Sequence, residues 1–490
     1  MDSNIARFFE SVKGKRVAFC GVGVSNTPLV AQFAAKGAHV LACDRRSREQ
    51  LGAAAAELES VGAQLRLGKT YLDNLDADIV FRTPGMYFNL PALKALRDRG
   101  VAVTSEMEVF AQLCPCPMIA VTGSDGKTTT STLIAKILEA QGIVSCGRSV
   151  SCERSVSCER SGRVHLGGNI GRALLPIVEE IDPGDIAVLE LSSFQLISMR
   201  AGFDVAVVTN VTPNHLDVHG CMEEYIEAKA NILRHQNAFT KTILNFDNAV
   251  TRGFAGEVRG ELRFFSYSEE VTRGAFLRTD GMLCVASGSR VTPLLHKSEI
   301  KLPGEHNVEN YLAAIAAVHD LVSIEAIREV ARNFGGVEHR IELAAEKASA
   351  RGAGAVRWYN DSIATSPTRT IAGLNAFDQK VILLAGGYDK QIPFQPMAGA
   401  VVEKVKLLIL TGPTAGAIEQ AIVSHPQYDA RALPILHAAD LAQAVALARD
   451  NAISGDVVLL SPACASFDAY PNFEARGRHF KELVGAEDQC

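Results

Sequence analysis

The sequence contains no uncharged apolar run that approaches about 18 residues, the length that a membrane-spanning helix requires. Its first residues, MDSNIARFF, lack the charged, apolar and small-residue regions of a secretory signal. Positive charge is not in excess either, because the formal net charge is -6, which argues against nucleic acid or an acidic membrane as the main partner. We therefore expect a soluble, cytoplasmic protein with no integral membrane segment and no nucleic-acid partner, and we expect it to act as a monomer.

The cysteines are irregularly spaced, and prolines are few. The 11 cysteines are an odd number at long spacings, so they define no complete disulfide framework. Only 18 prolines accompany 40 glycines, which fits many tight turns between strands and helices. Hydrophobic residues make up 47% of the chain and charged residues 21%, which excludes a wholly disordered or collagen-like chain.

Short apolar segments alternate with helix-like segments, a pattern typical of α/β folds with parallel sheets. Before residue 115 we expect strands at 16–20, 39–43, 79–83 and 101–105. The next part predicts strands at 118–121, 186–191, 204–210 and 240–245, a helix at 127–140, and a small antiparallel addition at 262–302. Beyond residue 335 we expect strands at 356–360, 381–387, 405–412 and 456–462.

These three series, in a chain of 490 residues, predict three consecutive α/β domains, with two as the alternative. The expected boundaries give domains 1–115, 116–335 and 336–490. Two prolines in CPCP (114–117) favour a linker at the first boundary, although a loop within one domain would also explain them.

A near-perfect tandem repeat of six residues occupies 145–162 (SCGRSV, SCERSV, SCERSG). Cys146, Cys152 and Cys158 recur every six residues, which raises the alternative of a metal or redox site. Zinc sites use closer cysteine pairs together with histidine, and three copies are too few for a β-helix. We therefore interpret the repeat as an exposed polar insertion.

The segment Ala120–Thr129 (AVTGSDGKTT) lies between a predicted strand and a predicted helix. Backbone N–H groups of such a turn and of the helix N-terminus bind phosphates, and Lys127 and Thr128 suit the β/γ-phosphates and Mg²⁺. Val121 stands where the usual spacing has its first glycine. A chance GKT is the alternative, but the strand–turn–helix context favours nucleotide binding.

A second glycine-rich turn, Gly21–Asn26 (GVGVSN), follows the first predicted strand, and Asp44 ends the second. An acidic residue about 20 positions on suits a ribose hydroxyl in a dinucleotide site. However, Asn26 replaces the third glycine, and Arg45 and Arg46 suit phosphate equally well. A tight turn without a ligand is a further alternative.

Three other residues could be functional, but their local sequence alone does not identify them as site residues. Glu190 ends an apolar strand, where a carboxylate near a phosphate loop holds Mg²⁺ or is simply solvated. Taken alone, His215 in NVTPNHLD is typical of a turn, and Lys229 on a helix is typical of a solvated charge.

Together these segments resemble the Mur ligases. Besides TGSDGKTT (122–129), the segments that carry the resemblance are GGNIG (167–171), LELSSFQL (189–196), NVTPNHLDVHG (210–220), EAKANIL (227–233), LPGEHNVEN (302–310), EHR (338–340), YNDSIATSP (359–367), GGYDK (386–390) and SPACASFDAYPNFEARG (461–477). They occur in the family's order and cover nearly the whole chain outside the repeat.

The resemblance implies a Rossmann-like UDP-binding domain, a P-loop ATPase-like central domain and a Rossmann-like C-terminal domain. It also implies an ATP-dependent amide ligase of peptidoglycan precursor synthesis that works through an acyl phosphate. LELSSFQL, SPACAS and NFEARG resemble the member that joins D-glutamate to UDP-N-acetylmuramoyl-L-alanine. A sibling enzyme that adds L-glutamate or another amino acid is the alternative.

The family's catalytic and metal positions fall on five residues here. Lys127 matches the phosphate-loop lysine, and Thr128 and Glu190 match the ligands of one Mg²⁺. His215 and Lys229 match a second Mg²⁺ site, where the lysine is carbamylated in the family and so becomes a carboxylate-like ligand.

The remaining implied site residues form three groups. For ATP they are Gly123, Ser124, Asp125, Gly126, Lys127, Thr128, Thr129, Asn307, Asn310, Arg340 and Asp361. For the UDP-substrate they are Gly23, Val24, Ser25, Asn26, Asp44, Arg45, Thr83, Pro84, Gly85, Asn169 and Ser192. For glutamate they are Thr365, Lys390, Ser466, Phe467 and Phe473.

Two departures from the family pattern put single contacts in doubt. Ile363 stands where many members have lysine, and Asp125 replaces the loop asparagine. Three more distant alternatives fit less well. A folylpolyglutamate-type ligase would lack the 16–46 segment, a nicotinamide-dependent dehydrogenase would leave TGSDGKTT unused, and a non-catalytic binding protein would not need Glu190, His215 and Lys229.

Overall fold

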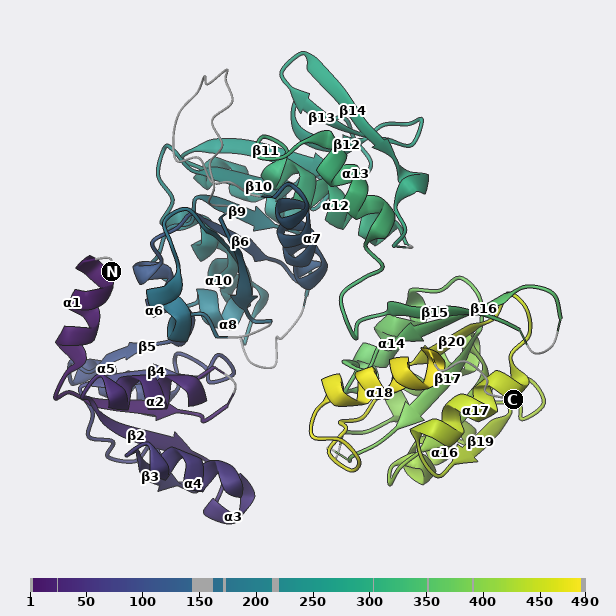
Figure 1. Cartoon of the computed structure of the whole chain (residues 1–490), viewed down its shortest axis with the longest axis horizontal. Helices are drawn as coiled ribbons and strands as arrows, with labels where there is room; N and C mark the ends of the chain where they lie inside the picture. Colours follow the sequence, from purple (N-terminus) through teal and green to yellow (C-terminus); the bar gives the residue numbers. More distant parts are fainter. Residues whose placement is uncertain are drawn as a thin grey trace. The chain divides into compact units, whose positions relative to one another are not determined.

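The computed structural model describes residues 3–23, 25–142, 162–170, 173–213, 220–302, 304–349, 352–389 and 392–485. The chain divides into two compact units, Met1–Asn333 and Phe334–Cys490 (Figure 1). Each is built from mostly parallel strands with helices between them, so the expected α/β architecture is confirmed. The finer division into 1–115, 116–335 and 336–490 stays a prediction.

The first sheet has five parallel strands in the order β3-β2-β1-β4-β5. The strands are β1 (Arg16–Cys20), β2 (His39–Asp44), β3 (Gln64–Leu67), β4 (Ile79–Arg82) and β5 (Ala102–Thr104). The helices are α1 (Ser3–Val12), α2 (Thr27–Ala35), α3 (Arg48–Leu51), α4 (Ala53–Ser60), α5 (Pro91–Asp98) and α6 (Glu106–Leu113). Because β1 is central and buried on both faces, its sequence RVAFC is apolar throughout after Arg16.

The second sheet has nine strands in the order β14-β13-β12-β11-β10-β9-β6-β8-β7. The strands are β6 (Met118–Thr122), β7 (Val164–Gly168), β8 (Ile186–Glu190), β9 (Val205–Val208), β10 (Lys241–Asn245), β11 (Glu261–Ser266), β12 (Arg273–Leu277), β13 (Met282–Ser287) and β14 (Arg290–His296). The helices are α7 (Lys127–Ala140), α8 (Ser193–Leu196), α10 (Met222–Arg234), α11 (Ala249–Gly253), α12 (Glu305–Val318) and α13 (Ile324–Asn333), with 3-10 helices η1 (Leu175–Glu180), η2 (Phe254–Glu257) and η3 (Lys297–Glu299).

The expected antiparallel addition at 262–302 is only partly antiparallel. β11 and β12 pair in parallel, whereas the β12–β13 and β13–β14 pairs are antiparallel. All four strands continue the nine-stranded sheet, because β11 pairs with the buried strand β10. The short alternating segments therefore extend the sheet edge and do not form a separate layer.

The first two sheets share a hydrophobic core. One continuous cluster contains Phe33 and Phe110 from the first sheet's helices together with Leu175 and Leu189 around the second sheet. Burial of this common apolar surface explains why residues up to Asn333 form one unit.

The third sheet has six strands in the order β15-β16-β20-β17-β18-β19, of which only β15 is antiparallel to its neighbour. The strands are β15 (Glu342–Ala348), β16 (Ala355–Asn360), β17 (Val381–Gly386), β18 (Val405–Thr411), β19 (Ile435–Ala438) and β20 (Val457–Leu460), and the helices are α14 (Pro367–Asn375), α15 (Gln395–Lys404), α16 (Ala415–Val423), α17 (Leu441–Asn451) and α18 (Phe473–Gly485). Tyr359 and Trp358 are adjacent on β16 and belong to different core clusters, since successive side chains point to opposite faces.

No helix among the described residues combines the length and the apolar character needed to cross a bilayer.

Candidate nucleotide-binding and catalytic site

The phosphate loop joins the end of β6 to the first residue of α7, as the sequence predicts. Gly123 and Gly126 have φ values of 155° and 77°, which L side chains rarely adopt. A Cβ atom on Gly126 would lie 2.3 Å from Asn310 Oδ1, and one on Gly123 would lie 1.8 Å from Thr209 Oγ1. Glycine is therefore required at both positions, because the turn needs these φ values and because Asn310 and Thr209 leave no room for a side chain.

The end of β9 holds the backbone of this loop in place. Thr209 Oγ1 donates to the carbonyl oxygen of Asp125 (2.5 Å), and Asp125 N donates to Asn210 Oδ1 (2.9 Å). The carboxylate of Asp125 itself belongs to an exposed residue, so its replacement of the family asparagine leaves the backbone contacts intact. Thr209 and Asn210 were not among the predicted site residues, although both follow a predicted parallel strand and Asn210 begins the NVTPNHLDVHG segment.

Lys127 lies over the loop that precedes it. Its Nζ donates to the carbonyl oxygens of Gly123 (2.9 Å) and Ser124 (2.7 Å). Its backbone opens the 14-residue helix α7, whose N-terminus carries partial positive charge. A lysine and a helix N-terminus at one glycine turn form a cationic cradle of the kind that binds phosphate.

Lys229 is buried in the same place, although it comes from α10. Its side chain is 1% exposed, and its Nζ donates a 2.7 Å hydrogen bond to the carbonyl oxygen of Gly123. Burial, and then the nearby charge of Lys127, hold the pKa of Lys229 well below its ordinary value. The structure thus brings Lys127 and Lys229 to one carbonyl group, and the uncharged amine of Lys229 is favoured.

Tyr225 belongs to this cluster and was missed from the sequence. Its ring lies 4.6 Å from Lys229 Nζ, and its hydroxyl lies 3.0 Å from Ser124 Oγ. Ser124 Oγ also donates to the carbonyl oxygen of Thr212 (2.9 Å). The signal was available, because Tyr225 precedes Lys229 by four residues and so lies on the same face of α10.

Glu190 ends β8 beside the phosphate-loop strand β6. Its side chain is buried, and Oε1 accepts a 3.0 Å hydrogen bond from Asn169 Nδ2. Oε2 is buried as well and has no hydrogen-bond partner among the described residues. An unpaired buried carboxylate oxygen is costly unless a ligand compensates it, so Glu190 fits a cation.

Within the described part of the chain, no three His, Cys, Asp or Glu residues gather in the manner of a metal site. Thr128 is buried at the start of α7, and Lys229 is an amine before any modification. His215 lies outside the described residues, so its predicted place beside Lys229 is not described.

Asn307 and Asn310 lie behind the phosphate loop, on α12. Asn310 Nδ2 donates to Asn307 Oδ1 (3.2 Å), and Thr130 Oγ1 donates to Asn310 Oδ1 (3.2 Å). The contact of Asn310 with Gly126 and α7 places both asparagines at the nucleotide end of the central sheet.

The turn after β1 lies against the turn after β4. A Cβ atom on Gly21 would approach Thr83 Cγ2 to 2.6 Å, and Thr83 N donates to the carbonyl oxygen of Cys20 (2.9 Å). The structure therefore brings together the segments Gly23–Asn26 and Thr83–Gly85. Val24 is not among the described residues.

Asp44 and Asn26 are largely committed to this turn. Val22 N and Arg46 Nε donate to the carboxylate of Asp44, both at 2.9 Å, and Asn26 Nδ2 donates to the carbonyl oxygen of Gly21 (3.0 Å). Burial opposes ionisation of Asp44, but these hydrogen bonds outweigh it and lower the pKa. The ionised carboxylate of Asp44 thus stabilises the turn through these hydrogen bonds, and Arg45 is the next residue in the sequence.

In the second unit, Asp361 is buried at the end of β16. Ser461 Oγ donates to Asp361 Oδ2 (2.7 Å), and burial raises the pKa of Asp361 to about 7, with the charge of Arg340 acting against the rise. Ile363, the departure from the family lysine, donates its backbone N–H to the carbonyl oxygen of His339 (3.1 Å).

The residues predicted to bind glutamate differ in exposure. Ser466 is buried, whereas Phe467 is 63% exposed, with its ring 5.8 Å from that of Tyr388. Phe473 begins α18, and its carbonyl oxygen accepts from Ser362 Oγ (2.8 Å). Thr365 follows β16, and Lys390 lies outside the described residues, as do residues 145–161 of the repeat.

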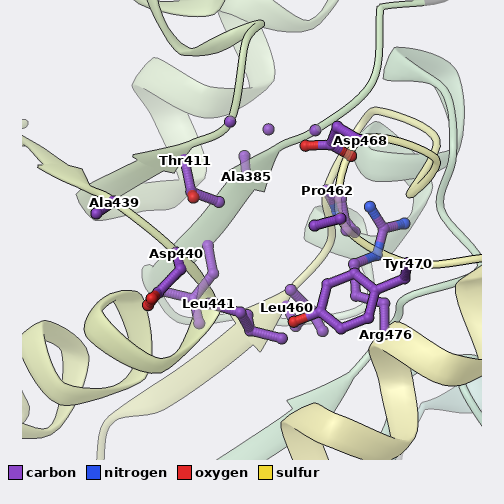
Figure 2. A pocket seen from close by; sticks show the side chains of 15 residues that line it. Ala385, Thr411, Ala439, Asp440, Leu441, Leu460, Pro462, Asp468, Tyr470 and Arg476 are labelled. Carbon is purple, nitrogen blue, oxygen red and sulfur yellow. The ribbon is translucent and has the colours of Figure 1, made fainter.

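A pocket of about 100 Å³ opens at the carboxyl ends of β17, β18 and β20 (Figure 2). Leu441, Leu460 and Tyr470 supply apolar walls, and Asp440 and Asp468 supply carboxylates. Arg476 also lines the pocket and donates to backbone carbonyl groups and to Ser362 Oγ, so its guanidinium is already hydrogen-bonded. Among the described residues, none that was predicted to bind glutamate lines this pocket.

Comparison with known proteins agrees with the geometry. Residues 121–318 match the Mur ligase middle domain, and residues 339–464 match the Mur ligase glutamate ligase domain. Relatives similar over the full chain include the UDP-N-acetylmuramoylalanine–D-glutamate ligases of Acetivibrio thermocellus (47% identity; 99% of both chains) and Symbiobacterium thermophilum (48%; 96% of this chain and 98% of the relative).

The chain belongs to the Mur ligase family.

Solved structures agree with this fold. The UDP-N-acetylmuramate–alanine ligase of Thermotoga maritima has a TM-score of 0.53 at 18% identity, covering 96% of this chain and 99% of that one. A pseudomurein peptide ligase type C of Methanothermus fervidus has a TM-score of 0.50 with the same identity and coverage. The expectation of a Mur ligase, and with it of an ATP-dependent ligase, is confirmed.

Proposed function

We propose that this Mur ligase joins D-glutamate to UDP-N-acetylmuramoyl-L-alanine, with ATP and Mg²⁺, in the cytoplasm as a monomer. The observation that carries the ATP-dependent step is the convergence of Lys127 and Lys229 on Gly123 of the phosphate loop. The substrate assignment is supported by full-length relatives at 47% and 48% identity that bear the name of this activity.

The reaction proceeds in two steps. An oxygen of the alanyl carboxylate attacks the γ-phosphorus of ATP, which forms an acyl phosphate and releases ADP. The amine of glutamate then attacks the acyl carbon, loses a proton, and displaces inorganic phosphate to leave the amide. Negative charge develops on phosphoryl and carbonyl oxygens in both steps, so fixed positive groups lower the barriers.

Lys127 and the backbone N–H groups from Gly123 to Thr129 bind the phosphates of ATP. Asn307 and Asn310 border the nucleotide from the central sheet, and the family pattern also assigns Arg340 and Asp361 to ATP. Ser124 and Asp125 contribute through the loop backbone, which Thr209 and Asn210 hold.

Glu190 and Thr128 would hold one Mg²⁺, and His215 and modified Lys229 a second. The buried, unpaired Oε2 of Glu190 supports the first of these assignments. The bound ions would neutralise charge on the phosphoryl oxygens.

The environment of Lys229 supports its carbamylation. Its uncharged amine can attack carbon dioxide, which forms an N–C bond and releases one proton to solvent. The product carries a carboxylate in place of a potential ammonium group, and a carboxylate is a suitable Mg²⁺ ligand. Burial lowers the pKa and so increases the fraction of the reactive, uncharged amine.

The remaining assignments follow the family pattern. The UDP-substrate lies on the two adjoining turns, Gly23–Asn26 and Thr83–Gly85, beside Asp44 and Arg45, and reaches Asn169 and Ser192 near Glu190. Glutamate is bound by Thr365, Lys390, Ser466, Phe467 and Phe473. We assign these functions to three domains, 1–115, 116–335 and 336–490.

Release of inorganic phosphate by the purified chain tests the proposal. With ATP, Mg²⁺ and UDP-N-acetylmuramoyl-L-alanine present, release should require added D-glutamate. Equal or faster release with L-glutamate or another amino acid would instead support the sibling activity. No amino-acid-dependent release with any of them would contradict the proposed function.

A further inference from the structure

Arg82 is a fully buried arginine whose side chain connects the first two sheets. It is the last residue of β4, directly before the Thr83–Gly85 turn, and its exposed fraction is 0%. Its Nη1 donates to the carbonyl oxygen of Met86 (3.0 Å), which closes that turn. A buried arginine is expensive to desolvate, so its partners deserve an explanation.

The other end of the guanidinium reaches the central sheet. Nη2 donates to the carbonyl oxygen of Phe194 (2.7 Å) and to Ser198 Oγ (2.9 Å). Phe194 lies in α8, the short helix that Ser192 caps and that begins three residues after Glu190. One rigid, planar group therefore joins the turn after β4 to the segment that carries Ser192 and Glu190.

The charge of Arg82 is balanced through the same contacts. Ser198 Oγ lies 3.4 Å from Glu108 Oε2, which also accepts from Thr104 Oγ1 (3.2 Å). Burial lowers the pKa of Arg82 to about 10, so the side chain is still cationic at neutral pH. Its Nε has no hydrogen-bond partner among the described residues. A buried donor without a partner costs free energy, so folding stability alone does not explain an arginine at this position.

We propose that Arg82 is a positioning residue that sets the spacing between the turn holding the uridine nucleotide and the α8 segment at the reacting end of the same substrate. This inference rests on the proposed function, because it assumes one substrate that spans both segments. A ligand that touches only the nucleotide turn should be indifferent to the spacing. A ligand that spans both segments should lose affinity when the connection is cut, since its two ends can no longer bind together without strain.

Calorimetric titration of the full chain with two probes tests the idea without turnover. The probes are UDP and UDP-N-acetylmuramoyl-L-alanine, with ATP and amino acid omitted. For Arg82→Met we expect about tenfold weaker binding of UDP-N-acetylmuramoyl-L-alanine and less than about threefold change for UDP, as for loss of charge-assisted hydrogen bonds. Arg82→Lys should recover part of the affinity.

Two further variants separate positioning from folding. Ser198→Ala removes one contact on the α8 side only and should weaken binding of the spanning ligand in the same direction but less. Arg97→Met is the matched control, because Arg97 stacks on Phe88 at 4.0 Å and donates to its carbonyl oxygen without reaching the second sheet. It should change neither affinity.

The outcomes are distinguishable. If the unmodified chain binds neither probe, or binds UDP but not the longer ligand, the proposed function fails first. If the unmodified chain binds both, and the Arg82 and Ser198 variants weaken both ligands equally or neither, the positioning role is wrong. In steady-state assays, the expected pattern is a raised KM for the UDP-substrate with an unchanged KM for ATP; equal loss of activity at all substrate concentrations would overturn it.

Discussion

The Nζ atom of Lys229 donates a 2.7 Å hydrogen bond to the carbonyl oxygen of Gly123, the first glycine of the phosphate loop. A lysine on α10 is thereby fixed to the turn that begins α7, with Lys127 on the same carbonyl oxygen. Burial lowers the pKa of Lys229 most, and the nearby charge of Lys127 lowers it further.

Lys229→Ala should reduce the rate of product formation by at least about 100-fold, because the ligand proposed for a second metal ion is lost. Short carboxylic acids added to the assay should restore part of the activity by supplying the missing carboxylate. Lys136→Ala is the matched control, since Lys136 is an exposed lysine on α7 paired with Glu139. Near-normal activity of Lys229→Ala would show that the buried amine is structural.

Gly126→Ala should weaken ATP binding by about tenfold or more, because the new Cβ would lie 2.3 Å from Asn310 Oδ1 at a φ of 77°. Gly100→Ala is the control, because Gly100 has a similar φ of 82° but no atom within 4 Å of the position of a Cβ. It therefore introduces backbone strain without a steric clash. Nucleotide titration should find normal ATP affinity in Gly100→Ala. Equal affinity in the two variants would refute the assigned role of the loop.

Glu190→Gln should raise the Mg²⁺ concentration needed for half-maximal activity several-fold, because an amide is a weaker ligand for Mg²⁺ than a carboxylate. The replacement keeps the shape of the side chain and an oxygen to accept from Asn169. Chelation of Mg²⁺ should abolish activity of the unmodified chain, and added Mg²⁺ should restore it. An unchanged Mg²⁺ response in the variant would exclude Glu190 as a ligand.

Asp361 makes the second unit sensitive to pH. In the unfolded chain this carboxyl loses its proton near its ordinary value of 3.8, whereas burial raises the folded pKa to about 7. Between these values the folded state binds more protons, so stability falls as the pH rises toward 7 and is then flat. The contribution is about 4 kcal/mol at most.

Asp361→Asn should remove this slope. Trp358, the single tryptophan of the chain, is buried on β16 and reports unfolding of the second unit by fluorescence. Denaturant titrations from pH 4 to 8 should give a smaller decline for Asp361→Asn than for the unmodified chain, while Asp468→Asn, at an exposed position, should leave the decline unchanged. Parallel curves for Asp361→Asn and the unmodified chain would contradict the assignment.

Much of this fold could be predicted from local pattern. The helix expected at 127–140 is α7 at the same residues, because a glycine turn and an apolar strand bound it on one side. The buried parallel strands were equally clear, since their sequences are apolar at successive positions. Short edge strands such as β3 and β19 were missed, because half-exposed residues give them little apolar pattern.

The candidate site was predictable as a set of residues but not as an arrangement. Taken alone, Lys229 has the local pattern of a solvated lysine, and only the packing of α10 against the phosphate loop buries it. Arg82 gave no signal either, because its acceptors on Phe194 and Ser198 are more than 100 positions away in the chain. Long-range contacts of this kind depend on tertiary structure, which local periodicity does not specify.

The most direct test of the account is mass spectrometry of the product formed from UDP-N-acetylmuramoyl-L-alanine, ATP and an equal mixture of isotopically distinguished D- and L-glutamate. We predict one product that carries a single D-glutamate in amide linkage, formed together with one ADP and one phosphate. A product that carries L-glutamate, or ADP formed without an amide product, would contradict the proposed function.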